Sequence, residues 1–94
     1  MKLFAVLAMA SIAMVASGAA SAQQELAQKS GCLNCHSVDA KKIGPSYKDV
    51  ATKYKGKADA EAQLVDKLSN AKGHPKVNAS PDDIKSLVKW VLSQ

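Results

Sequence analysis

The stretch Cys32-Leu33-Asn34-Cys35-His36 decides how this 94-residue sequence folds. Its spacing, C-x-x-C-H, is the attachment signature of a c-type haem. Two thiols on one turn can reach the vinyl groups at one haem edge as thioethers, and the next residue points its imidazole at the iron from the same side. Because such bonds are covalent, the haem cannot leave and becomes part of the core. The motif therefore predicts one covalently attached haem c held by Cys32 and Cys35.

Three other uses of the motif are weaker. A thioredoxin-type dithiol belongs at a helix start in a βαβ unit, and no segment of residues 23–94 has the pattern of a strand. A zinc site would recruit Cys32, Cys35, His36 and His74, but adjacent Cys35 and His36 strain a tetrahedral site, and structural zinc motifs separate their ligand pairs. A Cys32–Cys35 disulfide would close a loop too small to stabilise a domain.

The first 22 residues predict a secretory leader. Lys2 precedes an apolar run, residues 3–16, which only Ser11 interrupts. Small residues follow and end in Ala20-Ser21-Ala22, which has the A-x-A form of a cleavage site. The run is shorter than the roughly 20 apolar residues that a membrane helix needs. We therefore expect a signal peptide at 1–22, one domain at 23–94, a periplasmic location and no membrane span after the leader is removed.

The predicted domain is poor in apolar residues. The leader takes 17 of the 44 apolar residues, which leaves 27 among the 72 residues of the domain. Chains of this size rarely build a sufficient core without a disulfide, a metal or a large apolar cofactor. The domain has 12 lysines, 8 acidic residues and no arginine. Without clustered arginine and stacking aromatics, nucleic-acid binding is not expected.

Hydrophobic periodicity predicts an all-α domain of about four short helices. The expected helices cover residues 24–30, 47–54 and 59–69, and a last helix opens at Ser80-Pro81-Asp82-Asp83. These four residues combine a cap, a first-turn proline and acidic side chains, which are typical of a helix start. The expected buried stripe of the last helix is Ile84, Leu87, Val88 and Val91, with Trp90 beside it. Residues 38–45 and 70–79 are expected to be loops.

Three segments resemble the small monohaem class I cytochromes c of bacterial periplasms: KSGCLNCH at 29–36, IGPSYKDVA at 43–51 and KWVLSQ at 89–94. The resemblance implies a compact helical fold around one haem that transfers single electrons. It implies that His36 is the proximal iron ligand and that the Pro45 carbonyl accepts a hydrogen bond from the other imidazole nitrogen. Such an acceptor strengthens the ligand. Aromatics at Tyr47 and Trp90 usually pack in the haem-side core. Tyr47 is therefore a haem-pocket candidate, although ordinary core packing is the favoured role of both.

The sequence departs from this family at the distal ligand. The family normally supplies a methionine from the loop before the last helix, but all three methionines of the chain lie in the predicted leader. The Trp-Gly-Pro segment that usually precedes that methionine is also missing between Lys67 and His74. Aligned back from Trp90 without a gap, His74 takes the place that the methionine has in some members, and Pro75 keeps the following proline.

His74 is therefore the predicted distal ligand, since imidazole binds iron well. Two alternatives remain open. His74 can be a surface residue, which leaves the sixth iron position open or bound to water. The other loop residues that could bind the iron instead are Lys72, Lys76 and Asn78.

Six lysines make the front half of the domain basic: Lys29, Lys41, Lys42, Lys53, Lys55 and Lys57. They form either a solvated face or a surface on which an acidic redox partner docks transiently. Two functions follow from these observations. The first is a monomeric electron carrier, which is not an enzyme. The second is a ligand-binding haem protein for NO, CO or O2, with an open or displaceable sixth position. A periplasmic thiol protein without haem is a third and weaker possibility.

Overall fold

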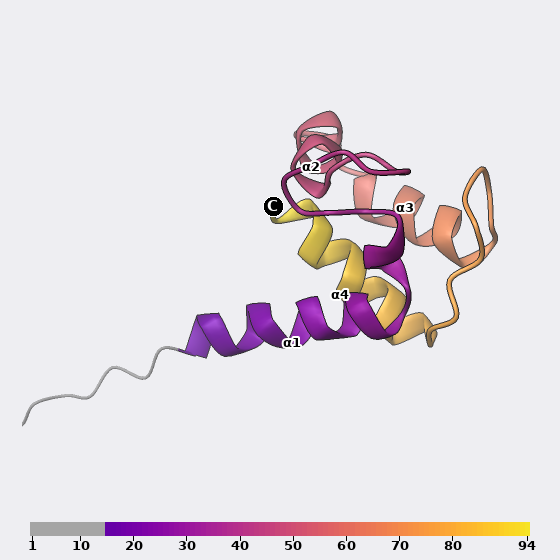
Figure 1. Cartoon of the computed structure of the whole chain (residues 1–94). Coiled ribbons are helices and arrows are strands. Elements are labelled where there is room, and N and C mark those ends of the chain that lie inside the picture. Colours follow the sequence, from indigo (N-terminus) through magenta and orange to yellow (C-terminus); the bar gives the residue numbers. More distant parts are fainter. Residues whose placement is uncertain (1–14) are drawn as a thin grey trace, which may run out of the picture.

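Four α-helices and one 3₁₀ turn form the chain in the computed structural model, which describes residues 15–94 (Figure 1). In order these elements are α1 (Val15–Lys29), η1 (Cys32–Asn34), α2 (Tyr47–Tyr54), α3 (Ala60–Ser69) and α4 (Pro81–Leu92). None of the described residues forms a strand. The prediction of an all-α fold with about four short helices is confirmed.

Helix α1 begins earlier than the sequence predicts. The expected first helix covered residues 24–30, whereas α1 starts at Val15 and continues through the predicted cleavage point after Ala22. Alanine has the highest helix propensity, and no proline interrupts this Ala-rich stretch, so the helix continues across Gly18. In Figure 1 the first turns of α1 extend beyond the other helices.

Most of the predicted leader, residues 1–14, lies outside the described residues, and its cleavage stays a prediction. Within residues 15–94, no helix combines the length and the apolar character that a membrane crossing requires.

Serine caps determine where α2 and α4 begin. The Ser46 Oγ accepts a hydrogen bond from the Asp49 N–H at 3.1 Å, and the Ser80 Oγ accepts one from the Asp83 N–H at 3.2 Å. Each bond satisfies a backbone donor of the first turn that has no partner within the helix. The predicted helix start at Ser80-Pro81 is therefore observed.

Helix α4 is the central element, because it contacts α1, α2 and α3. Its buried side chains are Ile84, Leu87, Val88 and Trp90. The predicted stripe is thus correct in three positions, but Trp90 is buried while Val91 is only partly buried.

The apolar side chains form two clusters. The first cluster joins α1, α2 and α4 through Ala27, Tyr47, Leu87 and Trp90. The second cluster joins α3, the following loop and α4 through Leu64, Val77, Ile84 and Val88. Side chains of both clusters line one cavity. The sequence has few apolar residues, and in the structure they form two clusters with a cavity between them instead of one continuous core.

Candidate functional site

The cavity between the two clusters has a volume of about 560 Å³, which is within the range of roughly 300–1,000 Å³ for small-molecule and cofactor sites. Its aliphatic and aromatic wall residues are Ile43, Tyr47, Val50, Tyr54, Leu64, Leu68, Val77, Leu87, Val88 and Val91. Cys32, Cys35, His36 and His74 line the same cavity. The structure thus brings the reactive side chains of the motif and the predicted distal ligand together in one place.

The motif starts in a tight turn that follows α1. Gly31 has a φ of 83°, in the left-handed region that glycine adopts without strain, and it is the cap of η1. The Cys32 carbonyl then accepts hydrogen bonds from the Cys35 N–H at 3.3 Å and from the His36 N–H at 3.0 Å. Because of this turn, two half-buried thiols and one imidazole reach the cavity from five consecutive residues.

The His36 ring is held by its neighbours. Its Nδ1 lies 2.7 Å from the Pro45 carbonyl oxygen. Because a carbonyl can only accept, Nδ1 is the protonated nitrogen and Nε2 keeps the lone pair that a metal needs. The Tyr47 ring stacks on the imidazole, with centroids 5.0 Å apart and planes at 23°.

Gly44 allows the loop 38–45 to pass close to this ring. A Cβ atom at Gly44 would lie 2.3 Å from Cε1 of His36, and this separation is too short for any residue with a side chain. The Gly44 N–H donates to the Cys35 carbonyl at 2.7 Å, and this bond ties the loop to the motif. The sequence pointed to Gly44-Pro45 as a loop, but it did not reveal that glycine is required for contact with the imidazole.

His74, in the loop before α4, has the same type of support. Its Nδ1 lies 2.7 Å from the Pro75 carbonyl oxygen, so its Nε2 also keeps a lone pair. The rings of His36 and His74 are nearly parallel, at 4°, and their centroids are 6.1 Å apart. Nothing in the sequence alone identified the Pro75 carbonyl as a partner of His74.

These residues fit a covalently attached haem c. The two thiols lie one turn apart, the walls are mostly apolar, and a glycine makes room for the imidazole of the motif. Ile43, whose side chain is 83% exposed, also lines the cavity. An apolar group bound in the cavity would cover this side chain, which explains a large exposed aliphatic residue that the sequence analysis did not single out.

The zinc alternative is disfavoured by the geometry. Among residues 15–94, no three His, Cys, Asp or Glu side chains converge as a metal site requires. Burial raises the pKa of the Cys32 thiol, which opposes the thiolate form that zinc binds. The thioredoxin alternative needs a βαβ unit, and the described residues contain no strand.

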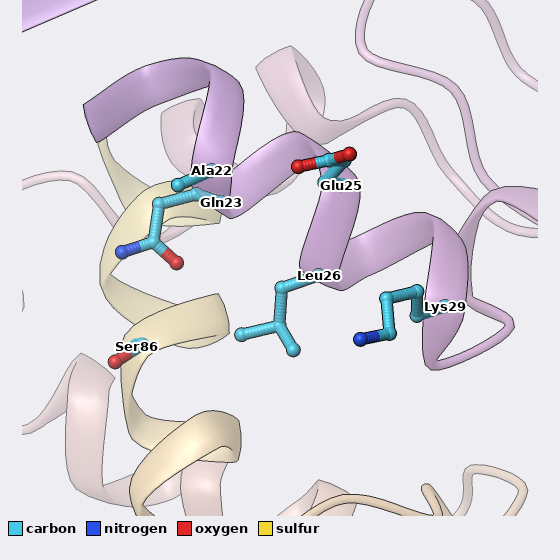
Figure 2. Close-up of a pocket in the computed structure, with 6 residues that line it drawn as sticks. All are labelled: Ala22, Gln23, Glu25, Leu26, Lys29 and Ser86. Carbon is cyan, nitrogen blue, oxygen red and sulfur yellow. The ribbon is translucent and has the colours of Figure 1, made fainter. Parts of the chain in front are cut away.

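A second hollow lies on the outside of the domain, between α1 and α4 (Figure 2). It is lined by Ala22, Gln23, Glu25, Leu26, Lys29 and Ser86. It contains none of the thiols or imidazoles, and it crosses the predicted cleavage point after Ala22. We therefore assign the functional site to the cavity around Cys32 and His36.

Comparison with known proteins identifies the family of this chain. The profile of the family described as "Cytochrome c" matches residues 20–94. Cytochrome c-551 of Allochromatium vinosum is 46% identical over 92 residues, which cover 89% of this chain and 98% of that protein. Cytochrome c-551 of Pseudomonas aeruginosa is 40% identical over 103 aligned positions, which cover 100% of this chain and 99% of that protein. Since the present chain has only 94 residues, that relative contains residues that this chain lacks.

Solved structures show the same relationship. The class 1 cytochrome MtoD of Sideroxydans lithotrophicus ES-1 is 43% identical with a TM-score of 0.67, and the match covers 78% of this chain and 92% of that chain. Wild-type cytochrome c552 of Nitrosomonas europaea is 38% identical with a TM-score of 0.66, over 74% of this chain and 96% of that chain. The chain therefore belongs to the cytochrome c family, as a small monohaem class I member that carries one covalently bound haem c and transfers electrons.

Proposed function

We propose that this protein is a periplasmic carrier of single electrons whose haem c is attached through Cys32 and Cys35 and ligated by His36 and His74. The observation that carries the proposal is the pairing of the two imidazoles in the cavity. Their rings are nearly parallel, and each Nδ1 is bound by a proline carbonyl. Two imidazoles with available Nε2 atoms are a suitable donor set for a six-coordinate iron.

The haem, when bound, supplies an iron that alternates between the ferrous and ferric states. The chain's own residues hold and shield it. The carbonyls of Pro45 and Pro75 orient the two imidazoles and select the tautomer in which Nε2 is free to bind the iron. Tyr47 restrains the His36 ring by stacking, and Trp90 supports Tyr47 edge-on at a centroid distance of 5.4 Å. The apolar walls limit the access of water, which is a further means by which a protein tunes a haem.

The other candidate ligands in the loop are less suitable than His74. The Lys72 Nζ donates to Asp66 at 2.8 Å and is therefore engaged elsewhere. Lys76 lines the cavity, but its ammonium group would have to lose a proton before it could bind iron. Asn78 is exposed, and the cavity wall does not include it.

Ligation by two histidines implies a lower reduction potential than that of methionine-ligated cytochromes. Residues 23–94 contain no methionine. A methionine paired with a histidine raises the potential of a haem, whereas imidazole donates more electron density to ferric iron. With two histidines as ligands, the chain itself would supply both protein ligands of the iron and leave no position for a substrate, which is the arrangement of an electron carrier and not of an enzyme.

The test of the ligand pair compares the wild-type protein with His74→Ala. Absorption and EPR spectra are recorded for the oxidised and reduced proteins, with and without CO. We expect a low-spin, six-coordinate wild type that binds CO only slowly, because His74 must first leave the iron, and a high-spin variant that binds CO readily. Lys76→Ala, which changes another cavity-lining residue of the same loop, is the matched control and should resemble the wild type.

Two results would contradict the ligand pair. The first is an unchanged ferric EPR spectrum and CO response in His74→Ala. The second is a high-spin wild type that binds CO freely, which would favour the alternative of a ligand-binding haem protein for NO, CO or O2.

The periplasmic location depends on the predicted leader. We expect the purified protein to begin at Gln23, and its mass to equal that of residues 23–94 plus one haem. Acid-acetone should fail to extract the haem, because thioether bonds hold it. A mass with two free thiols or one disulfide would exclude haem attachment, and retention of residues 1–22 would exclude cleavage of the leader.

Exposed lysines support transient docking to an acidic redox partner. Lys41, Lys42, Lys53, Lys55 and Lys57 are exposed, and Lys53 also lines the cavity. Electron exchange should slow as salt rises, since the Debye length is ~8 Å at physiological ionic strength.

Charge reversal at Lys53 and Lys55 should lower the association rate with such a partner more than it raises the dissociation rate. The matched control is reversal at Lys85 and Lys89, which are exposed on α4 and do not line the cavity. Rates that stay flat with salt, or that respond equally to both pairs, would show that the lysines are only solvated.

A further inference from the structure

The loop that carries His74, residues 70–79, contains a strained turn. Ala71 has a φ of 52°, and it is the only non-glycine residue with a positive φ in the part of the chain that the structure describes. In this left-handed region, the Cβ of an L-residue crowds the following carbonyl oxygen. Such a conformation persists only where neighbouring contacts hold it in place.

Asp66, in the last turns of α3, makes these contacts. Its Oδ1 accepts a hydrogen bond from the Asn70 Nδ2 at 2.6 Å, and its Oδ2 accepts one from the Lys72 Nζ at 2.8 Å. One carboxylate therefore binds the residues on both sides of Ala71. The backbone adds a bond from the Lys72 N–H to the Lys67 carbonyl at 3.0 Å. The Lys72 ammonium and, next, the Asn70 amide hold the pKa of Asp66 below its ordinary value of 3.8.

The other end of the loop is held by Val77. This side chain is 9% exposed and packs with Leu64, Ile84 and Val88 in the second apolar cluster. His74 thus lies between two attachment points, with Lys72 before it and Val77 after it. The first point is polar and exposed, and the second is apolar and buried, so the first is the one that can open without disturbing the core.

We propose that Asp66 is a positioning residue for His74, because its carboxylate holds the left-handed turn at Ala71 and so keeps the imidazole on the iron. This inference rests on the proposed function, since it requires His74 to be the distal ligand. Asp66 itself does not line the cavity. Its side chain is 46% exposed and that of Lys72 is 64% exposed. Exposed pairs contribute little each, so we expect the loss of Asp66 to increase loop opening by about two- to fivefold.

The test is the rate at which CO binds to the ferrous protein, because CO can bind only after His74 leaves the iron. Asp66→Ala should bind CO about two- to fivefold faster than the wild type. Asp59→Ala is the matched control. The Asp59 Oδ2 accepts a hydrogen bond from the Gln63 Nε2 at 2.6 Å, so the control loses a carboxylate contact at the opposite end of α3 from the loop. Its CO rate should equal that of the wild type.

A second substitution tests the left-handed turn directly. In the Asp66→Ala background, Ala71→Gly should return the CO rate toward the wild-type value, since glycine adopts a positive φ without strain. If Asp66 only stabilised the fold, Asp66→Ala would lower the midpoint of denaturant unfolding, and Ala71→Gly would not restore the CO rate.

The outcomes separate this inference from the proposed function. If the wild type binds CO as fast as His74→Ala, His74 is not the ligand and the proposed function fails. If the wild type is slow and Asp66→Ala is equally slow, the proposed function stands and the role of Asp66 is wrong. The role is also wrong if Asp59→Ala accelerates CO binding as much as Asp66→Ala, or if Ala71→Gly does not restore the rate.

Discussion

At the scale of single residues, the site depends on which nitrogen of each imidazole carries the proton. Two backbone carbonyls decide this, at Pro45 for His36 and at Pro75 for His74. A carbonyl is a better fixed partner than water, because it orients the ring and selects the tautomer at once. The chemistry of the two histidines is therefore controlled by the path of two proline-containing loops.

Gly44→Ala should disrupt this control. The added Cβ would lie 2.3 Å from the His36 ring, so either the imidazole or the loop must move. Overpacking of this kind costs about 1–3 kcal/mol in the free energy of unfolding, and displacement of His36 should also lower the yield of haem-loaded protein. Denaturant unfolding and the absorption spectrum measure the two effects.

Gly56→Ala is the control for this substitution. Gly56 has a φ of 80° but no atom within 4 Å of a built Cβ, so alanine there introduces backbone strain without a clash. It should lower the free energy of unfolding by roughly 1–2 kcal/mol and leave the spectrum unchanged. A Gly44→Ala protein with a normal spectrum and yield would show that the imidazole does not need the space at Gly44.

At the scale of elements, the start of α4 fixes the point at which the loop that carries His74 ends. Ser80 caps the helix immediately after that loop, and the bond to the Asp83 N–H satisfies a donor that would otherwise have no partner in the helix. At the other end of the loop, Asp66 of α3 binds the side chains of Asn70 and Lys72 and holds the first residues of the loop in place. Two helix ends, and not the loop sequence alone, therefore define where His74 lies.

Ser80→Ala should lower the free energy of unfolding by about 1 kcal/mol, within the usual range of roughly 0.5–2 kcal/mol for a lost cap. Ser80→Asp should retain most of the stability, because aspartate caps helices about as well as serine. Denaturant titration of the haem-loaded proteins gives both values. Equal losses for alanine and aspartate would mean that the Ser80 hydroxyl contributes something other than the cap.

The Asp66 contacts should give the loop a dependence on pH. Because the pKa of Asp66 in the folded protein lies below its ordinary value of 3.8, its stabilising effect is present above that value and is lost as pH falls through the folded pKa. The difference in unfolding free energy between the wild type and Asp66→Ala should therefore be constant above about pH 5 and should shrink in stronger acid. A difference that instead grew in acid would contradict the assigned ion pair with Lys72.

At the scale of the whole molecule, the sequence predicted the features that have a local cause. The Ser80-Pro81 start of α4 and the position of α2 at Tyr47–Tyr54 follow from caps and periodicity. The start of α1 at Val15 was not predicted, because an Ala-rich segment is typical both of a signal peptide and of a helix. The contact of Gly44 with His36 depends on the path of a loop, and the bonds of Asp66 are exposed polar contacts that leave no hydrophobic pattern.

The divided core leads to a prediction about the chain without its haem. Each of the two apolar clusters has only four buried residues, and the cavity of about 560 Å³ lies between them. Domains of this size need an additional source of stability, which a covalent haem would supply by joining the clusters. The Cys32→Ala, Cys35→Ala double variant should therefore be mostly unfolded, with a weak helical circular dichroism signal and no cooperative urea transition.

Because Cys32 itself packs against the first cluster, the loss of haem must be separated from the loss of the thiol. Residues 23–94 with both cysteines, produced without haem attachment, provide this control and should be as unfolded as the double variant. The haem-loaded protein should unfold in one cooperative transition, since both clusters then share one core. If the chain without haem kept the helical content and the cooperative transition of the haem-loaded protein, the two clusters would be sufficient by themselves, and the cavity would be a binding site in a domain that is already stable.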